Sequence, residues 1–556
     1  MSLPTFSTQS ELFSTAGLSG GLFAATDRYR LFGKLVYPRL AQVRSQLAAS
    51  YCLDNGRSAV EPVLLLGVSL LQYLEAVPDR QAVDLLRYHV GWNFALNRQV
   101  GDELLHPTTL VNFRQRLLEH DLSAVAFQTV LEALIQAGLV ARQSRQRLDS
   151  TQMFGRVSRM SRLDCVSESL RLALQELEGA VQLEARPLFW VALWERYVES
   201  QVDYRASTET LARKLVEAGA DARQLLGWLQ SQAQPQWAQG QQAQLLARVF
   251  GEQFEVVAGA ARPQLKGKEQ LNSDRVQNPH DPEATYATKG QGEQRKEHVG
   301  YKVQVAETVS EATLAAGEPT RNFIAGMTTH PAYQSDEAGA LKMQAEQAVM
   351  GLDKPPVQYV DGAYVSGQPL AVAAAEGREL IGPASAAPDN NGGRLTTERF
   401  LVKVEERQAV CPAGHTHTQC SRLEEGQTRK VTFRFEWSTH CAACCLRQQW
   451  VGPKQKHRTI VVTEHHSALQ VRRQEQRTEA FKQRMRHRNG IEGTQSELVR
   501  GHGLRRARYR GLAKAKLQNH FIGTACNVKR WIRREIWRLK QAVSVGAAQV
   551  ASATAG

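Results

Sequence analysis

The chain has 556 residues, of which 69 are Lys or Arg and 55 are Asp or Glu, so its formal net charge is +14. With 42% hydrophobic and 22% charged residues it has the composition of a globular protein, which excludes a largely disordered or collagen-like chain. The longest apolar run, residues 62–71, is about half as long as a membrane helix, and the polar N-terminus lacks the features of a secretory signal. We therefore expect a cytoplasmic protein that does not contact a membrane.

The positive charge is concentrated in one segment. Residues 471–540 hold 20 Lys or Arg and 5 Asp or Glu, whereas the rest of the chain holds 49 and 50. From Leu517 to Leu539 apolar residues recur every three or four positions, which predicts an amphipathic helix with a basic face. Such a face most often binds a nucleic-acid backbone, because neutralising phosphates releases counterions.

The N-terminal quarter predicts an arm followed by helices. Residues 1–24 are rich in Ser, Thr and Gly and predict a flexible arm, and residues 25–142 show helical spacing of apolar side chains. Residues 106–118 predict a helix capped by Thr108 or Thr109 that carries Arg114 and Arg116. This pattern resembles a helix-turn-helix DNA-binding domain; the alternative is a helical bundle with a solvated basic face.

The middle of the chain predicts an α/β core with two insertions. Strand-like runs lie at residues 147–153, 300–309, 322–328, 357–360 and 379–381, with a helical stretch at 338–350. The first insertion has helical spacing, and its aromatic stripe Trp190, Trp194 and Tyr197 indicates core packing. The second alternates strand-like runs with clustered cysteines and predicts a small β unit.

These patterns set the expected domain boundaries. The core comprises residues 143–160 and 266–395, the helical insertion 161–265, the cysteine-containing β insertion 396–470, the basic helical part of the core 471–540 and a flexible tail 541–556.

Three acidic residues occupy positions suited to metal-dependent phosphodiester chemistry. Asp149 lies on the first predicted strand, Asp361 at the end of the strand 357–360, and Glu492 at the start of a helix in the basic segment. Carboxylates are preferred ligands of Mg²⁺, and open α/β sheets bind ligands at the carboxyl ends of their strands. Each residue also has an ordinary alternative role, a turn or cap for the two aspartates and an i,i+4 pair with Arg488 for Glu492.

The sequence around these residues resembles a known family. LDSTQM around Asp149, VDGAYVSG around Asp361 and the R-x3-E step in RNGIEGTQSELVRGHGLRRARYRG, followed by NVKRW, resemble the signature blocks of the DDE transposases of bacterial insertion sequences. The segments DRQAVDLLRYHVGWNFAL and HPTTLVNFRQRL resemble the InsH-type N-terminal domain that accompanies them. The sequence departs from the family pattern at Met485 and Val499, which stand where Tyr and Lys are expected, with Arg500 one position later.

The resemblance implies a fold, a reaction and partners. The fold is an α/β RNase H-like catalytic core, interrupted by a helical insertion and a small β insertion and preceded by an all-α DNA-binding domain. Asp149 would lie on the first strand, Asp361 after the fourth and Glu492 on the last long helix, holding two Mg²⁺ or Mn²⁺ ions for strand cleavage and strand transfer. The expected partners are double-stranded terminal inverted repeats and target DNA, bound by a homodimer associated with the nucleoid.

Two further activities remain as alternatives, a transposase-derived DNA-binding regulator without catalysis and an RNase H-like nuclease that only cleaves. The expected DNA contacts are basic side chains near the signature blocks: Arg114, Arg116, Arg156, Arg159, Arg488, Arg500, Arg505, Arg506 and Arg508. Arg162 continues the spacing of three from Arg156 and Arg159, for which a solvated face is the alternative.

Five of the eight cysteines fall within 35 residues. Cys441 and Cys444 have half of a zinc-ribbon spacing, and Cys411 with His415 offers the other half, for which His417 and Cys420 are alternatives. The preferred interpretation is a structural Zn²⁺ bound by Cys411, His415, Cys441 and Cys444. The alternative is a set of reduced thiols, as is usual in the cytosol.

Overall fold

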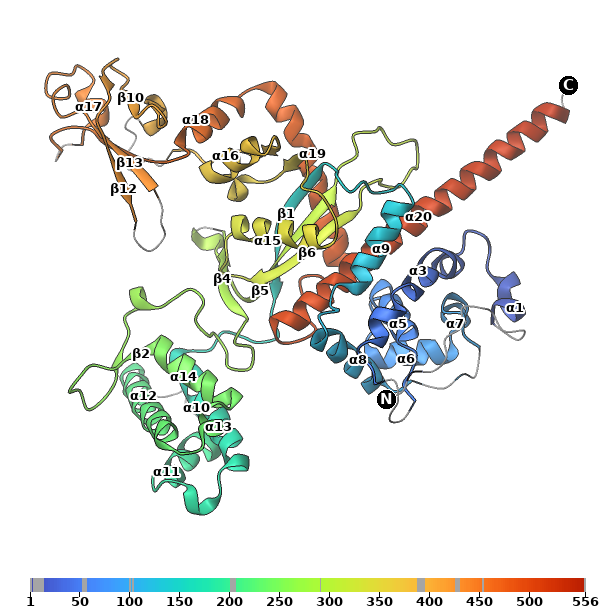
Figure 1. Ribbon diagram of the computed structural model, residues 1–556, viewed down its shortest axis with the longest axis horizontal. Coiled ribbons are helices and arrows are strands. Elements are labelled where there is room, and N and C mark those ends of the chain that lie inside the picture. The colour runs from blue at the N-terminus through green and yellow to red at the C-terminus, as the bar shows by residue number, and fades with distance from the viewer. Residues whose placement is uncertain are drawn as a thin grey trace.

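The computed structural model of the protein describes residues 15–52, 58–99, 105–200, 207–290, 292–387, 396–425, 431–452 and 455–554, together with residues 3 and 102. Its centre is a mixed sheet flanked by helices, from which one helical and one β-rich lobe stand apart (Figure 1). None of the helices in the described part of the chain combines the length and the apolar character needed to cross a bilayer.

Five strands of the central sheet follow the order β6, β5, β1, β7, β8. Their bounds are Gln146–Phe154 for β1, Lys296–Thr308 for β5, Ile324–Pro331 for β6, Val357–Tyr359 for β7 and Glu379–Ile381 for β8. β5 is antiparallel to β1 and β6, whereas β7 is parallel to both β1 and β8. β4 (Thr285–Lys289) pairs with the first half of β5. All five predicted strands are confirmed, and Asp361 follows the fourth of them.

The two faces of the sheet pack against different helices because alternate strand residues point to opposite sides. Leu148 and Ala306 pack with residues of α15 (Asp336–Val349) and α16 (Gly367–Ala375). Val303 and Val305 belong instead to a large core on the other face, which includes residues of α19 (Glu479–His502) and α20 (Leu512–Thr554). Asp149 stands opposite Val305 in the β1–β5 register, so its side chain projects toward α19.

The long helix α20 lies at the centre of the molecule and then projects beyond it (Figure 1). The predicted apolar residues Leu517, Phe521 and Val528 are buried, as expected. The predicted basic face is absent from the first part of this stretch, where α20 is buried between β6, α5 (Pro62–Leu74) and α9 (Val125–Gln136), whereas Arg533 and Arg538 near its end are exposed. The predicted tail is helical up to Thr554, where α20 ends.

The N-terminal region is helical, as predicted, but it shares one continuous core with the sheet and α20. Its remaining helices are α1 (Thr15–Ser19), α2 (Arg28–Leu31), α3 (Tyr37–Ala41), α4 (Arg44–Ala48), α6 (Asp79–Tyr88), α7 (Val90–Ala95) and α8 (Pro107–Glu119). Tyr73 of α5 stacks on Phe521 of α20 with ring centroids 5.2 Å apart. The N-terminal helices are thus fixed to α20 by aromatic packing.

Two local predictions in this region are corrected. Residues 4–14 of the predicted arm lie outside the described residues, but from Thr15 the arm is helical, and the buried Thr15 hydroxyl donates to the Arg98 carbonyl at 2.5 Å. The cap of α8 is His106, whose Nδ1 lies 3.3 Å from the Thr108 amide and accepts its hydrogen bond. Imidazole nitrogen can replace a hydroxyl here because the cap needs only an acceptor.

The first insertion forms a helical lobe with its own core. Its main helices are α10 (Arg162–Ala180), α11 (Trp190–Trp194), α12 (Thr208–Ser231), α13 (Pro235–Ala238) and α14 (Gln241–Gln253). Trp190 and Tyr197 are buried in this core and Trp194 packs against it, which confirms the predicted core role of the aromatic stripe.

The second insertion is a β-rich lobe, as predicted. Its strands are β9 (Leu401–Lys403), β10 (Gln408–Val410), β11 (Thr416–His417), β12 (Cys420–Glu424), β13 (Val431–Glu436) and β14 (Thr459–Thr463), in two three-stranded sheets. A compact aromatic core, including Phe400, Trp437 and Trp450, packs them together. α18 (His466–Glu475) then returns the chain to the central sheet and leads into α19.

Candidate active site

The three predicted carboxylates come together from β1, from the end of β7 and from α19. In the parallel β1–β7 pair Arg147 is opposite Tyr359, so Asp149 and Asp361 each lie two residues beyond a matched position. Residues at equal distances along parallel strands reach the same sheet edge, which explains why these two acids meet. Asp361 also accepts a hydrogen bond from the Ala363 amide at 2.9 Å, so the predicted turn role is present as well.

Glu492 lies in the middle of α19, which corrects its predicted place at a helix start. It is also not on the last long helix, because α19 ends at His502 with Gly503 in the left-handed conformation (φ 71°) and α20 follows. An added Cβ at Gly490 would lie 1.9 Å from Nη1 of Arg147, so any larger residue here would have to displace this guanidinium from its buried contacts. The close approach of α19 to β1 brings Glu492 to the edge that carries the two aspartates.

Arg488 is the side chain around which the carboxylates gather. Its Nη2 lies 3.1 Å from Oδ2 of Asp149 and 3.9 Å from Oδ2 of Asp361. Its Nη1 lies 3.6 Å from Oε1 of Glu492, so the i,i+4 pair expected as the structural alternative is formed too. The side chains become more accessible in the order Asp149, Asp361 and Glu492, with 12%, 38% and 71% exposed.

Burial and the nearby positive charge shift the pKa of Asp149 in opposite directions. Burial raises its pKa to about 6, and the neighbouring Asp361 adds to this rise, whereas Arg488 and the Ser150 amide lower it. A carboxyl group with this pKa is ready to exchange a proton for a cation near neutral pH. Perturbed carboxylates of this kind are concentrated at functional sites.

A buried ionic network holds the elements behind the site. The Glu307 carboxylate accepts from Nε of Arg147 at 2.5 Å, Nη1 of Arg530 at 2.6 Å and the Thr494 hydroxyl at 2.6 Å. Arg147 also donates to the His487 carbonyl of α19 at 3.1 Å. The network therefore joins β1, β5, α19 and α20 directly beneath Arg488. Sequence reasoning missed it; the only local signal is an Arg two residues before Asp149.

The carboxylates suit a divalent cation, but Arg488 stands between them. Aspartate and glutamate oxygens are the ligands that Mg²⁺ and Mn²⁺ prefer. Within the described part of the chain, the one group of three candidate ligands whose donor atoms lie within 4.8 Å of one another is Glu497, His502 and Cys526. Asp149, Asp361 and Glu492 are therefore more widely spaced in this conformation, and to hold a metal they must close up as Arg488 withdraws.

The predicted basic contacts divide into exposed and internal side chains. Arg500, Arg505 and Arg506 are exposed, as are Arg156 and Arg159 beside the end of β1. Arg505 and Arg506 reach this end because the Arg505 carbonyl accepts from the Phe154 amide at 2.8 Å. These five side chains remain available to phosphates.

Three of the predicted DNA contacts have partners within the N-terminal helices or nearby rings. Arg114 is 5% exposed and pairs with Asp79, so it is buried with its counter-ion. Arg116 packs over the Tyr51 ring, with the guanidinium carbon 4.1 Å from the centroid. Arg508 lies over the Tyr73 ring at 4.7 Å. The DNA contact is therefore withdrawn for Arg114 alone, whereas for the half-buried Arg116 and Arg508 it stays a prediction.

The predicted zinc site is not assembled. Cys411 and Cys441 are buried in the aromatic core of the β lobe, and Cys441 Sγ accepts from the Arg458 amide at 3.5 Å. No three of Cys411, His415, Cys441 and Cys444, all of which the structure describes, gather within the 4.8 Å that a metal requires. These thiols pack as small apolar side chains.

The group Glu497, His502 and Cys526 does not replace the predicted zinc site. Arg530 and Lys529 lie 3.0 and 3.5 Å from the Glu497 carboxylate, and their positive charges oppose a further cation there.

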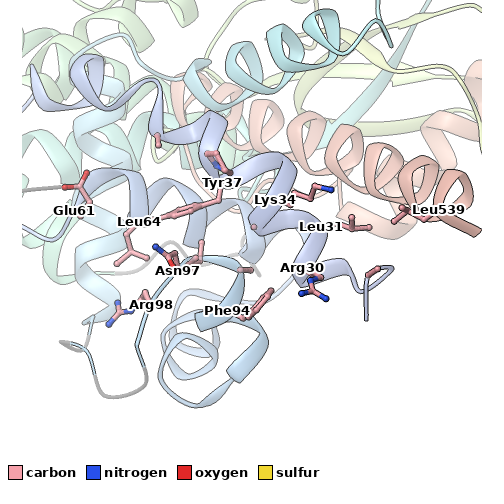
Figure 2. Close-up of a pocket in the computed structure, with 16 residues that line it drawn as sticks. Arg30, Leu31, Lys34, Tyr37, Glu61, Leu64, Phe94, Asn97, Arg98 and Leu539 are labelled. Atoms are coloured by element: carbon pink, nitrogen blue, oxygen red, sulfur yellow. The ribbon is translucent and has the colours of Figure 1, made fainter. Parts of the chain in front are cut away.

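A cavity of about 620 Å³ opens between the N-terminal helices and α20 (Figure 2). Arg30, Lys34, Tyr37 and Leu539 are among its lining residues, and none of the three site carboxylates is. The chemistry expected of the site therefore belongs to the sheet edge and not to this cavity.

Comparison with protein families gives two matches. Residues 21–116 match a family model described as a transposase domain, and residues 410–532 match one described as a transposase DDE domain. The second match includes Arg488 and Glu492, whereas Asp149 and Asp361 lie outside it. A search of curated proteins finds no match.

Proposed function

The chain belongs to the DDE transposases, and on this premise we propose that it binds the terminal inverted repeats of an insertion element and catalyses metal-dependent strand cleavage and strand transfer. The observation that carries the proposal is the meeting of Asp149, Asp361 and Glu492 around one guanidinium at a sheet edge. The strand order and the position of Asp361 after the fourth strand support an RNase H-like core.

The carboxylates would act as the ligands of two Mg²⁺ or Mn²⁺ ions, which when bound supply a nucleophile activated at neutral pH and stabilisation of the leaving oxygen. Asp149 and Asp361 are held by strands, so they orient these ligand oxygens with little loss of side-chain freedom. Glu492, with 71% of its side chain exposed, completes the set from the helix.

Two displacements at phosphorus follow one another in the proposed reaction. In cleavage, a water oxygen bonds to phosphorus and the bond to the 3′-oxygen breaks, which leaves a free 3′-hydroxyl. In strand transfer, that hydroxyl oxygen bonds to a target phosphorus and the target 3′-oxygen leaves. Arg488, once withdrawn from the carboxylates, is placed to pair with a phosphate of the bound strand.

The proposed DNA contacts beside the site are Arg156, Arg159, Arg488, Arg500, Arg505 and Arg506. We also retain the homodimer as a proposal, because terminal repeats occur in pairs and two-fold assemblies match paired sites.

Substitution of each carboxylate tests the assignment. Asp149→Asn, Asp361→Asn and Glu492→Gln should each abolish Mg²⁺-dependent cleavage of a labelled terminal-repeat duplex while retaining DNA binding. Glu479→Gln is the matched control, because Glu479 lies on the same helix, is 78% exposed and pairs with Lys482. Unchanged cleavage by all three variants would refute the catalytic assignment.

The wild-type protein discriminates the remaining alternatives. Binding of the repeat without cleavage at any Mg²⁺ or Mn²⁺ concentration would favour a DNA-binding regulator. Cleavage without joining to a target plasmid would favour a nuclease. Cleavage followed by joining is the outcome expected for the proposed transposase.

A further inference from the structure

A second cationic site lies where the helical lobe meets the core. It is a cavity of about 480 Å³ beside the start of α10. Among the described residues its lining includes Arg159, Arg162, Lys268 and Arg275 but no acidic side chain. The four cations come from three separate parts of the chain, at residues 159–162, 268 and 275. Folding therefore gathers like charges that the sequence keeps apart.

Arg162 is the fixed member of this group. Its Nε donates to Oε1 of Gln253 at 2.6 Å, its Nη1 to the Lys266 carbonyl at 3.0 Å and its Nη2 to the Gln253 carbonyl at 2.9 Å. All three acceptors are neutral, so the guanidinium is held in place without a counter-ion. Burial lowers the pKa of Arg162, and the positive charge of Arg275 lowers it further, as expected for a cation lacking an anion.

The start of α10 also faces this cavity. This helix has 19 residues, Ser161 is its N-cap, and Ser161, Arg162 and Cys165 all line the cavity. The amides of a first helical turn carry partial positive charge and favour anions. Asp164 in the same turn accepts a hydrogen bond from the Ser161 hydroxyl at 2.7 Å and offsets part of this charge, so the four cations carry most of the preference for an anion.

We propose that this cavity, hereafter the α10 phosphate site, binds a backbone phosphate of DNA at a distance from the carboxylates. The inference rests on the proposed function and names a second contact surface for the same DNA. Arg159 already pairs with the exposed Glu297. A single small anion would neutralise only one or two of the other three cations, whereas a polyanion places successive phosphates along the surface.

The path between the two sites supports an extended ligand. β1 carries Asp149 and ends at Phe154, a rise of about 17 Å at the usual spacing of strand residues. There Phe154 forms a parallel bridge with Arg506, and Arg156 donates from Nη1 to the Arg508 carbonyl at 3.1 Å. The exposed Arg505 and Arg506 thus lie beside the end of the strand, from which the chain continues to Arg159 and the α10 phosphate site.

The salt dependence of DNA binding tests the inference. In the full-length protein, Lys268→Gln with Arg275→Gln should reduce the slope of log affinity against log salt by about 1.8, since each lost phosphate contact removes about 0.9. The double variant Arg213→Gln with Lys214→Gln, on α12 of the same lobe and outside the cavity, should leave the slope unchanged. Lys268→Arg with Arg275→Lys should also retain it.

Each outcome is decisive for one claim. A wild-type slope in the Gln double variant, with DNA still bound and the melting temperature unchanged, overturns the α10 phosphate site and leaves the proposed function intact. No DNA binding by the wild-type protein refutes the proposed function itself. A third outcome is that inorganic phosphate raises the melting temperature of the wild type but not of the variant, while the salt dependence of DNA affinity is the same for both. The cavity then binds a free anion, and its assignment to DNA fails.

If the Gln double variant does not fold, Arg159→Gln is the second test. Arg159 is half exposed and pairs with the equally exposed Glu297, so its loss leaves no buried partner. It should reduce the slope by about 0.9, and an unchanged slope would again overturn the proposal.

Discussion

Replacing Arg488 with Gln should weaken the metal-free protein and strengthen its binding of divalent cations. The guanidinium now neutralises part of the charge of three carboxylates, at 3.1, 3.6 and 3.9 Å. A metal that enters must first break these contacts, so their free energy is subtracted from the affinity of the wild-type site. In the variant this cost is absent, and the repulsion among the acids adds to the attraction for a cation.

The size of the effect follows from the exposure of the partners. At an effective dielectric constant near 20, two unit charges about 4 Å apart attract by about 4 kcal/mol, before the cost of removing them from water. Glu492 is 71% exposed and Asp361 38%, so solvent screens most of their attraction to Arg488. Asp149 is only 12% exposed, so its attraction to Arg488 is screened less. We expect a net effect of about 1 to 2 kcal/mol, which is roughly a five- to thirtyfold gain in affinity.

Calorimetric titration of Mn²⁺ into the DNA-free protein measures this gain, and thermal melting without metal measures the loss of stability. Arg484→Gln is the matched control, because Arg484 precedes Arg488 by one helical turn and pairs with Glu379 outside the site. Equal Mn²⁺ affinities for the wild type, Arg488→Gln and Arg484→Gln would show that Arg488 does not compete with the metal.

Three further predictions concern the site and its support. Asp149 has a folded-state pKa near 6 against an ordinary 3.8, so the folded state binds its proton more tightly than the unfolded state. The free energy of unfolding should therefore fall as pH rises from 4 to 6, by at most about 3 kcal/mol. Asp149→Asn should remove this dependence in urea unfolding measured across that range. Gly490→Ala should destabilise by about 1 to 3 kcal/mol and reduce cleavage, whereas Gly493→Ala, which meets no atom within 4 Å, should be neutral or stabilising in thermal melts. Glu307→Ala should cost about 3 to 5 kcal/mol in chemical unfolding because the buried Arg147 loses its carboxylate partner and the buried Arg530 keeps only Glu497. A cost below about 1 kcal/mol, as for the exposed Glu311→Ala, would refute the network's role.

The elements that could be predicted from the sequence are those with a local signal. β1 and β5 were found from runs of β-compatible residues, and the helical lobe from the spacing of its apolar and aromatic side chains. The three carboxylates were found because each follows or interrupts a recognisable pattern. Their meeting could not be derived from periodicity, because it depends on the parallel register of β1 and β7 and on the glycine that lets α19 approach Arg147.

The basic segment shows why charge along a sequence does not locate a binding surface. Arg530 lies in its amphipathic helix, yet it is 4% exposed and pairs with Glu307, which is 223 residues away in sequence. Arg505 and Arg506, in the same segment, are exposed beside β1. The local excess of positive charge therefore contains two populations, one that neutralises buried acids from distant strands and one that faces solvent. The two populations can be told apart only when the acidic partners are known, and these partners come together only in the folded protein. The α10 phosphate site illustrates the reverse case, since its four cations come from a part of the chain without net positive charge.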